Sequence, residues 1–445
     1  MTPPDGCSGP APDGPDQRRL LLVAPSPRLV QEAVSAGYAV WTVSDSREAG
    51  AEPTGWGTPA GPSGPAGVSA GADPGAEGLT GQVGPPGPSP GPAPVPLRAD
   101  FGDARALCDL IAETARDHHI GWLLAFGEVS TLPALLETAE RLELSPNPAE
   151  SVRLLGDPSA MRGLLNGSEH SYVTSVCAQS FDELPTAVER VGMPAMVRPL
   201  GAGAAGPRAV LVRERPDIDT GRVRERLSDH PGPYLVETFL DGPEYGVETL
   251  TVDGMHRVLG ITALHRAGPA GHDHLFPAPL AAGDEAEIRA ATTGLLGLAG
   301  YEFGFAYTVA VLTADGPRIV RSQARQADEP IGRLIELATG FAPEAELLRA
   351  LTGAPVEPPV AHRYASAVPF RLSPGEELPA CRLKEITGLP GVRDVRLPHP
   401  RGNDPVPDAG ADGDGQGHVV LTAGSPAEAS LRVASTLRLL GAEKG

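Results

Sequence analysis

The chain has 445 residues, which is enough for roughly two to three domains with buried cores. Its formal net charge of −20 argues against nucleic acid or an anionic membrane surface as a partner, because both favour clustered basic residues. Without an apolar run of about 18 residues or an apolar N-terminal core, we expect neither a membrane span nor a signal peptide. The four cysteines have neither metal-ligand nor disulfide spacing, which predicts reduced thiols in a soluble, cytoplasmic protein.

Residues 18–150 predict a small open α/β domain. The strand Arg19–Ala24, the helix Arg28–Gly37 and the strand Ala39–Ser44 form a β-α-β opening. Residues 47–96 are rich in Gly, Pro, Ala and Ser without a triplet period, which predicts a disordered insertion. The domain then continues with the helix 104–118, the strand 121–126 and the helix 132–142.

Residues 151–357 predict a two-lobed module, with lobes over 151–233 and 234–357, and residues 358–445 predict a C-terminal α/β lobe. The first lobe begins with one helix over 151–167 and contains a strand, 195–199, that leads into a glycine-rich turn. The second lobe contains a hairpin that turns over Asp253-Gly254. Further strands are expected at 172–177, 209–212, 234–237, 245–252, 256–262, 303–313, 317–322, 365–371, 392–397 and 418–422, and helices at 182–191, 223–228, 285–298, 331–339 and 426–439.

Lysine is nearly absent from this chain. The two lysines are Lys384 and Lys444, so arginine supplies 34 of the 36 basic residues. Any function that needs a cation before residue 384 must therefore use arginine.

Four segments in one order carry a resemblance to a known superfamily. They are MVRPLGAGAAG (196–206), YLVETFLDGPE (234–244), FGFAYT (303–308) and DGPRIVRSQAR (315–325). With these segments the chain resembles the ATP-grasp superfamily, and within it the carboxylate–amine ligases that include the L-amino acid ligases. The closer resemblance rests on GHDHLFPA (271–278), on IGRLIELATG (331–340) and on the C-terminal lobe.

The resemblance implies an ATP-grasp fold, with ATP as cofactor and an amino acid or another carboxylate as substrate. Gly201, Gly203 and Gly206 match the loop that closes over the phosphates, where backbone N–H groups approach the ligand closely. The stretch from Glu237 to Gly242 matches the hinge that reads adenine, and Glu244 matches the acid that accepts the ribose hydroxyls.

The basic residues of this family are altered here. Arg198 stands where the family has a lysine before the glycine loop, and a planar guanidinium is not equivalent to a compact ammonium group. Pro158 stands where the family has an earlier lysine, so that position has no side-chain donor.

The family's magnesium ligands, two glutamates and an asparagine, are replaced by Val309, Arg321 and Gln323. Magnesium prefers oxygen ligands and usually includes a carboxylate, so we expect the Mg²⁺ site to be lost. Without divalent ions, phosphoryl transfer loses its main source of charge neutralisation.

Two further residues are catalytic candidates from the resemblance. Arg325 matches an arginine that contacts the phosphorylated intermediate and the substrate carboxylate, and His274 matches a histidine of the amino-acid pocket. Zinc binding by the nearby histidines is disfavoured, because we expect these residues to lie in an irregular loop. The acidic loop over 403–417 lacks the ligand alternation of an EF-hand.

Three functional hypotheses follow. The favoured one is a catalytically impaired member of the carboxylate–amine ligases that serves in binding or beside a partner protein. The second is an active ligase that forms an amide through an acyl phosphate, with Arg198 and Arg321 in unusual roles. The third is a scaffold that binds no nucleotide, against which the retained Glu237 and Glu244 speak.

Overall fold

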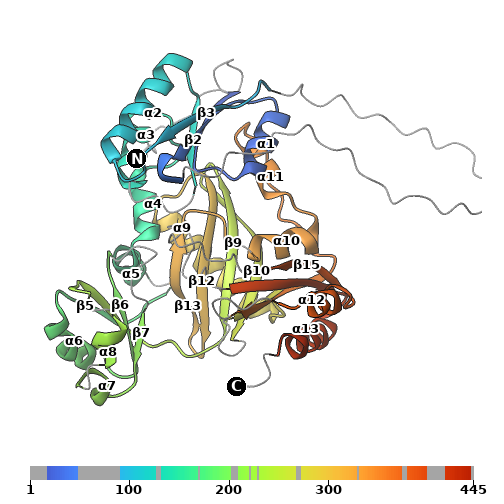
Figure 1. Ribbon diagram of the computed structural model, residues 1–445. Coiled ribbons are helices and arrows are strands. Elements are labelled where there is room, and N and C mark those ends of the chain that lie inside the picture. Colours follow the sequence, from blue (N-terminus) through green and yellow to red (C-terminus); the bar gives the residue numbers. More distant parts are fainter. Residues whose placement is uncertain are drawn as a thin grey trace, which may run out of the picture.

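The computed structural model describes residues 18–48, 91–126, 132–168, 171–201, 209–219, 222–227, 230–266, 272–327, 330–372, 378–397 and 416–441. Figure 1 shows three bodies of secondary structure: an N-terminal domain, a small lobe around β5–β8 and a large sheet that includes β9, β10, β12 and β13. Among the described helices, none combines the length and the apolar character needed to cross a membrane.

The N-terminal domain has a four-stranded parallel sheet in the order β3-β2-β1-β4. Side chains alternate across β1, so Leu20 and Leu22 pack with α1 while Leu21 and Val23 pack with α2 and α3. The helices and strands predicted for this domain are confirmed with small changes at their ends, and β3 is a strand that the sequence analysis did not predict. The bounds are β1 (Arg19–Val23), α1 (Pro27–Ser35), β2 (Ala39–Asp45), β3 (Val95–Ala99), α2 (Ala104–His118), β4 (Trp122–Ala125) and α3 (Leu132–Arg141).

The prediction of a disordered insertion over 47–96 is wrong at both ends. Arg47 and Glu48 lie in the 3-10 helix η2 (Ser46–Glu48). Val95 and Pro96 lie in β3, where they pair with Trp41 and Thr42 of β2. Just before this strand, the Gly91 N–H donates to the carbonyl oxygen of Val34 at 2.7 Å. Residues 49–90 lie outside the described residues.

The helix predicted over 151–167 is in fact two helices, α4 (Ala149–Gly156) and α5 (Pro158–Asn166). The break is at Asp157, which has an extended backbone and whose carboxylate accepts from the N–H groups of Ser159 and Ala160. Pro158 occupies the first turn of α5, where a missing N–H costs no hydrogen bond. A cap and a proline therefore end one helix and begin the next.

The small lobe is a four-stranded antiparallel sheet in the order β5-β8-β6-β7. Its core is apolar and includes Val197, Val212, Tyr234 and Val236. The elements are β5 (Ser175–Ala178), η3 (Phe181–Glu183), α6 (Leu184–Val191), β6 (Ala195–Pro199), β7 (Val210–Val212), α7 (Arg215–Asp219), α8 (Arg222–Arg226) and β8 (Tyr234–Thr238).

The large sheet has eight antiparallel strands in the order β13-β12-β9-β10-β11-β14-β16-β15. The helix α9 packs on one face and α10 on the other, each burying its apolar side. The elements are β9 (Glu244–Val252), β10 (Met255–Arg266), β11 (His272–Phe276), α9 (Ala282–Leu298), β12 (Gly304–Thr313), β13 (Gly316–Gln323), α10 (Ile331–Thr339), α11 (Pro343–Ala350), β14 (Tyr364–Arg371), α12 (Ala380–Thr387), β15 (Val392–Arg396), β16 (Gln416–Ala423) and α13 (Pro426–Leu440).

Two features of this sheet bear on the sequence predictions. The hairpin between β9 and β10 is confirmed, since Asp253 and Gly254 have φ of 50° and 69°, as a tight two-residue turn requires. The prediction of an irregular loop around His272 and His274 is wrong, because these residues lie in the strand β11, which pairs with β10 and β14. The predicted acidic loop lies outside the described residues except for its last two positions.

Candidate functional site

The strand register brings several predicted site residues onto one face of the large sheet. Gly246 of β9 lies opposite Val309 of β12, which in turn lies opposite Arg321 of β13. Side chains alternate along a strand, so Glu244 and Gln323 share the face of Arg321. Through β10 the same face reaches His274, which pairs with Leu264.

Val309 is part of the apolar core beneath the start of α10. Its exposed fraction is 3%, and it packs with Leu264, Tyr307, Ala327 and Ile331. Neither a buried isopropyl group nor the Arg321 guanidinium can ligate a cation, which leaves the Gln323 amide as the oxygen donor among these three positions. These three residues do not fit the magnesium site that the family would place there.

Glu248 is a buried carboxylate on this face that the sequence analysis missed. It is 2% exposed, and both its oxygens accept from the Ala327 N–H, at 3.1 and 3.4 Å. The four-residue spacing from Glu244 along β9 was the available signal, because strand residues an even number of positions apart share a face.

A cluster of charged groups lies where the small lobe meets the edge of the large sheet. Arg162 of α5 is 2% exposed, and its Nε donates to Glu237 Oε1 of β8 at 2.6 Å. Its Nη2 donates to the carbonyl oxygen of Ile319 on β13 at 2.7 Å, and its Nη1 to that of Ser171 at 3.4 Å. The sequence analysis did not select Arg162, because nothing in the helical pattern distinguishes it.

Arg198 of β6 and Arg321 of β13 complete this cluster. Glu237 Oε2 is 4.0 Å from the Arg198 Nη2. Burial lowers the pKa of the Arg198 guanidinium despite the attraction of Glu237, and the charges of Arg321 and Arg162 lower it further. Two guanidinium groups, those of Arg162 and Arg198, thus share the Glu237 carboxylate, and Arg321 adds a third positive charge close enough to act on Arg198. Among these four groups the positive charges outnumber the single carboxylate.

The resemblance assigned the backbone of the hinge from Glu237 to Gly242 to adenine, and that role stays a prediction; the side chain of Glu237 has a structural contact. It is 6% exposed and held by Arg162. The rest of the hinge packs on the large sheet: the Leu312 N–H donates to the Pro243 carbonyl oxygen at 3.0 Å. A Cβ on Gly242, whose φ is 150°, would lie 2.2 Å from the Leu312 carbonyl oxygen, so only glycine fits this contact.

The remaining predicted residues are placed as follows. Gly201 follows β6 with φ of 71°, whereas Gly203 and Gly206 lie outside the described residues. Arg325 is half-buried just after β13. His274 is half-buried on β11, where its carbonyl oxygen accepts from Ser366 Oγ at 2.7 Å.

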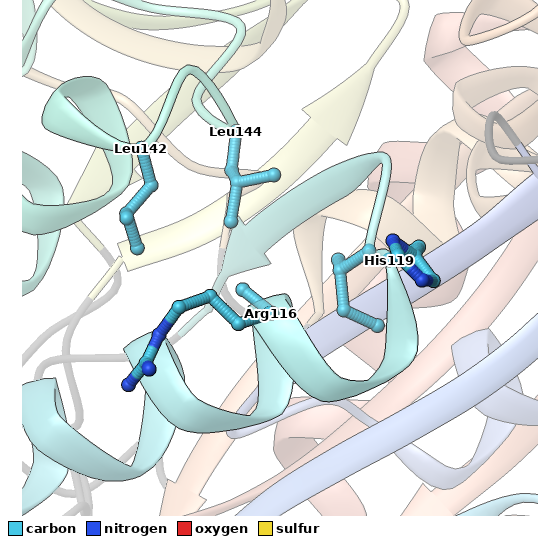
Figure 2. A pocket seen from close by; sticks show the side chains of 6 residues that line it. Arg116, His119, Leu142 and Leu144 are labelled. Atoms are coloured by element: carbon cyan, nitrogen blue, oxygen red, sulfur yellow. The ribbon is translucent and has the colours of Figure 1, made fainter.

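A separate hollow lies in the N-terminal domain, remote from these residues. Figure 2 shows it between the C-terminal end of α2 and the residues that follow α3. Its volume is about 420 Å³. It is lined by Ala115, Arg116, His119, Ile120, Leu142 and Leu144. The hollow is therefore separate from the cluster of Arg162, Arg198 and Arg321.

Comparison with known proteins identifies relatives by sequence and by structure, although no family model matches the chain. A formate-dependent phosphoribosylglycinamide formyltransferase of Burkholderia pseudomallei is 29% identical over 243 residues, 49% of this chain and 55% of the relative. The matched region thus spans about half the length of this curated relative. The same enzyme of Burkholderia lata is 27% identical over 321 residues, 67% of this chain and 74% of the relative.

Solved structures match over nearly the whole chain. An L-amino acid ligase from Bacillus licheniformis has a TM-score of 0.68 at 18% identity, covering 94% of this chain and 96% of its own. An N5-carboxyaminoimidazole synthase from Aspergillus clavatus, in complex with ADP and 5-aminoimidazole ribonucleotide, has a TM-score of 0.66 at 14% identity. That match covers 95% of this chain and 99% of the other. The shared fold extends over all three bodies of secondary structure.

Proposed function

Because this chain has the ATP-grasp fold, we propose that it binds a nucleotide between its small lobe and its large sheet. It would do so as a divergent relative of the carboxylate–amine ligases, with little or no catalytic turnover, and would act through binding or beside a protein partner.

The observation that carries this proposal is the excess of arginine at the junction of the lobes. Arg162 and Arg198 lie against one carboxylate, Glu237, and the charge of Arg321 acts on Arg198. Bringing like charges together at a partly buried site is costly, and an anionic ligand would relieve that cost. Guanidinium groups also suit phosphate oxygens, which they bind through paired N–H donors. Arg198 and Arg321 would hold the phosphates, and Glu244 would accept the ribose hydroxyls.

The impaired turnover follows from the magnesium positions. Val309 is buried among apolar side chains and Arg321 is cationic, so neither can ligate a metal ion. Arginine can neutralise phosphate charge, but it cannot bridge two phosphate oxygens and a nucleophile as an ion does. Phosphoryl transfer depends on such positioning and neutralisation, and the rate should fall by orders of magnitude.

Titration calorimetry with ADP and ATP tests the binding. We expect similar affinities in Mg²⁺ and in excess chelator, and a roughly tenfold weaker affinity for Arg321→Gln, since a charge-assisted contact is lost. Arg153→Gln is the matched control, because Arg153 pairs with Glu150 on the exposed surface of α4. An affinity gain of about tenfold with Mg²⁺ would contradict metal-independent binding, and no binding at all would favour the scaffold.

Phosphate release distinguishes the impaired protein from the active ligase. We expect none above background with ATP, Mg²⁺ and a panel of amino-acid pairs. The panel should also include formate, because the curated relatives are formate-dependent transferases by name. Phosphate release coupled to amide formation would establish the active ligase instead.

A further inference from the structure

We propose that Arg162 is a positioning residue that sets the charge and orientation of Arg198 through the shared carboxylate of Glu237. The expected effect of Arg162 on nucleotide affinity rests on the proposed function. The effect of Arg162 on Arg198 through Glu237 does not.

Arg162 is fixed from three sides. Its guanidinium donates to Glu237 in the small lobe, to Ile319 at the edge of the large sheet and to Ser171 between them. Five donors in a rigid plane suit such a three-way contact, and lysine cannot reproduce it. Because the side chain is 2% exposed, solvent hardly competes for these acceptors.

The contact with Ile319 also satisfies outward-facing backbone groups of an edge strand. β13 is the outermost strand of the large sheet, and its register shifts between Val309 and Ala310, so Val320 is an extra residue there. Beside this bulge, the Ile319 N–H donates to Ser171 Oγ at 2.8 Å and the Ile319 carbonyl accepts from Arg162. Backbone groups that a neighbouring strand would otherwise pair thus anchor the small lobe.

The carboxylate of Glu237 transmits this anchoring to Arg198. Its Oε1 is 2.6 Å from Arg162 Nε, which leaves Oε2 at 4.0 Å from Arg198 Nη2. Arg198 is thereby attracted by Glu237 without forming a close ion pair, and its side chain stays 21% exposed. If Arg162 were lost, both carboxylate oxygens could turn to Arg198 and neutralise the charge that the nucleotide requires.

The first test measures Arg198 without any nucleotide. Phenylglyoxal reacts with the neutral guanidine, and its rate at Arg198 is followed by mass spectrometry. In Arg162→Met we expect a rate at least about threefold slower, because the closer carboxylate favours the charged form. In Glu237→Gln we expect a faster rate. Arg162→Lys should lie nearer the wild type, and Arg153→Met should equal it.

The second test is a double-mutant cycle on ADP affinity. Arg162→Met should weaken binding by about tenfold, and its effect should largely disappear in an Arg198→Gln background. A purely structural role of Arg162 would instead give additive losses and an unchanged Arg198 reaction rate.

The outcomes separate the two proposals. Wild-type protein that binds no ADP overturns the proposed function, and the reaction rates then decide the role of Arg162 alone. Equal rates at Arg198, within about twofold, in wild type and Glu237→Gln overturn the inference, even if Arg162→Met fails to fold.

Discussion

Val309 belongs to the apolar core at a position where the resemblance to the carboxylate–amine ligases implies an acidic metal ligand. It is 3% exposed among apolar neighbours. Val309→Glu should therefore lower the free energy of unfolding by about 2–4 kcal/mol, since a carboxylate would lose its hydration without a partner. Urea unfolding measures the difference.

Val360 provides the control for this substitution, because it is 70% exposed. Val360→Glu should change the free energy of unfolding by less than about 0.5 kcal/mol. If Val309→Glu were equally neutral and bound Mg²⁺ more tightly, the position would be a latent metal ligand rather than a part of the core.

At the residue scale, the sequence could be compared with a family pattern but could not show which residues meet in space. The departures at 198, 309 and 321 come from that comparison, and the loss of the metal site that they imply stays a prediction. The partner of Glu237 was not readable, because Arg162 lies 75 residues earlier and meets it through tertiary structure. The burial of Val309 was likewise hidden, since it depends on the packing of α10 over β12.

Among the elements, α11 and the N-terminal domain are joined by a buried hydrogen bond. Tyr38 is 3% exposed, and its hydroxyl donates to the Leu348 carbonyl oxygen at 3.1 Å. Tyr38→Phe should cost about 1–2 kcal/mol in the free energy of unfolding, because the carbonyl oxygen is left without this donor. Tyr172→Phe is the control, since Tyr172 is 60% exposed. Equal, small effects in urea unfolding would show that water replaces the lost donor.

The end of β2 is tied to the residues that follow β3 by Asp45. Its carboxylate accepts from the Arg47 side chain and from the backbone N–H groups of Arg47 and Phe101. The side-chain contact with Arg47 is the main reason that the pKa of Asp45 lies below its usual value. The stabilisation is thus fully present above the unfolded-state pKa, about 3.9, and is lost as the pH falls through the lower folded-state pKa.

Asp45→Asn should therefore be less stable than the wild type near pH 7, by less than about 1 kcal/mol because Arg47 is exposed. The gap should close as the pH falls from about 5 towards 2. Thermal unfolding across this range measures it. Asp109→Asn should follow the wild type throughout, because Asp109 is an exposed helix residue. A gap that persists at low pH would show that Asp45 acts without its charge.

Elements were predicted best where local chemistry fixes them. The Asp253-Gly254 turn was readable because it needs residues that accept positive φ. The break at Asp157 was missed. A capping residue followed by proline begins a new helix, and here the same two residues also end the helix before it. The strand β11 was missed because its polar sequence, HDHLF, becomes a strand through its neighbours β10 and β14.

At the scale of the whole molecule, residues 49–90 are part of the chain that connects β2 to β3. Their composition predicts that they contribute little to a core. The strands β2 and β3 are parallel, so the chain between them needs about a dozen residues or more. Replacing 49–90 with a Gly/Ser linker of about 15 residues should keep the melting temperature within a few degrees. The natural segment should also be the first cut in limited proteolysis. A variant that fails to fold would show that the segment carries structure.

The order of the motifs predicted the fold of the whole chain, because the sequence segments that match the glycine turn, the hinge and the final strands follow one another in the same order in the ATP-grasp superfamily. It could not predict how the lobes are held. That depends on one guanidinium meeting β8 and β13, and on strands of the C-terminal lobe continuing the large sheet.

The scarcity of lysine has a practical consequence for finding proteins of this kind. Lys384 lies on α12, in the C-terminal lobe, and no amine side chain precedes it. Acyl-phosphate nucleotide reagents mark their targets by acylating a lysine beside the bound phosphates. If the proposed nucleotide site exists, such a reagent bound at the arginine cluster would find no lysine before residue 384 to label. Surveys that define nucleotide-binding proteins by lysine acylation would then miss a binder of this kind.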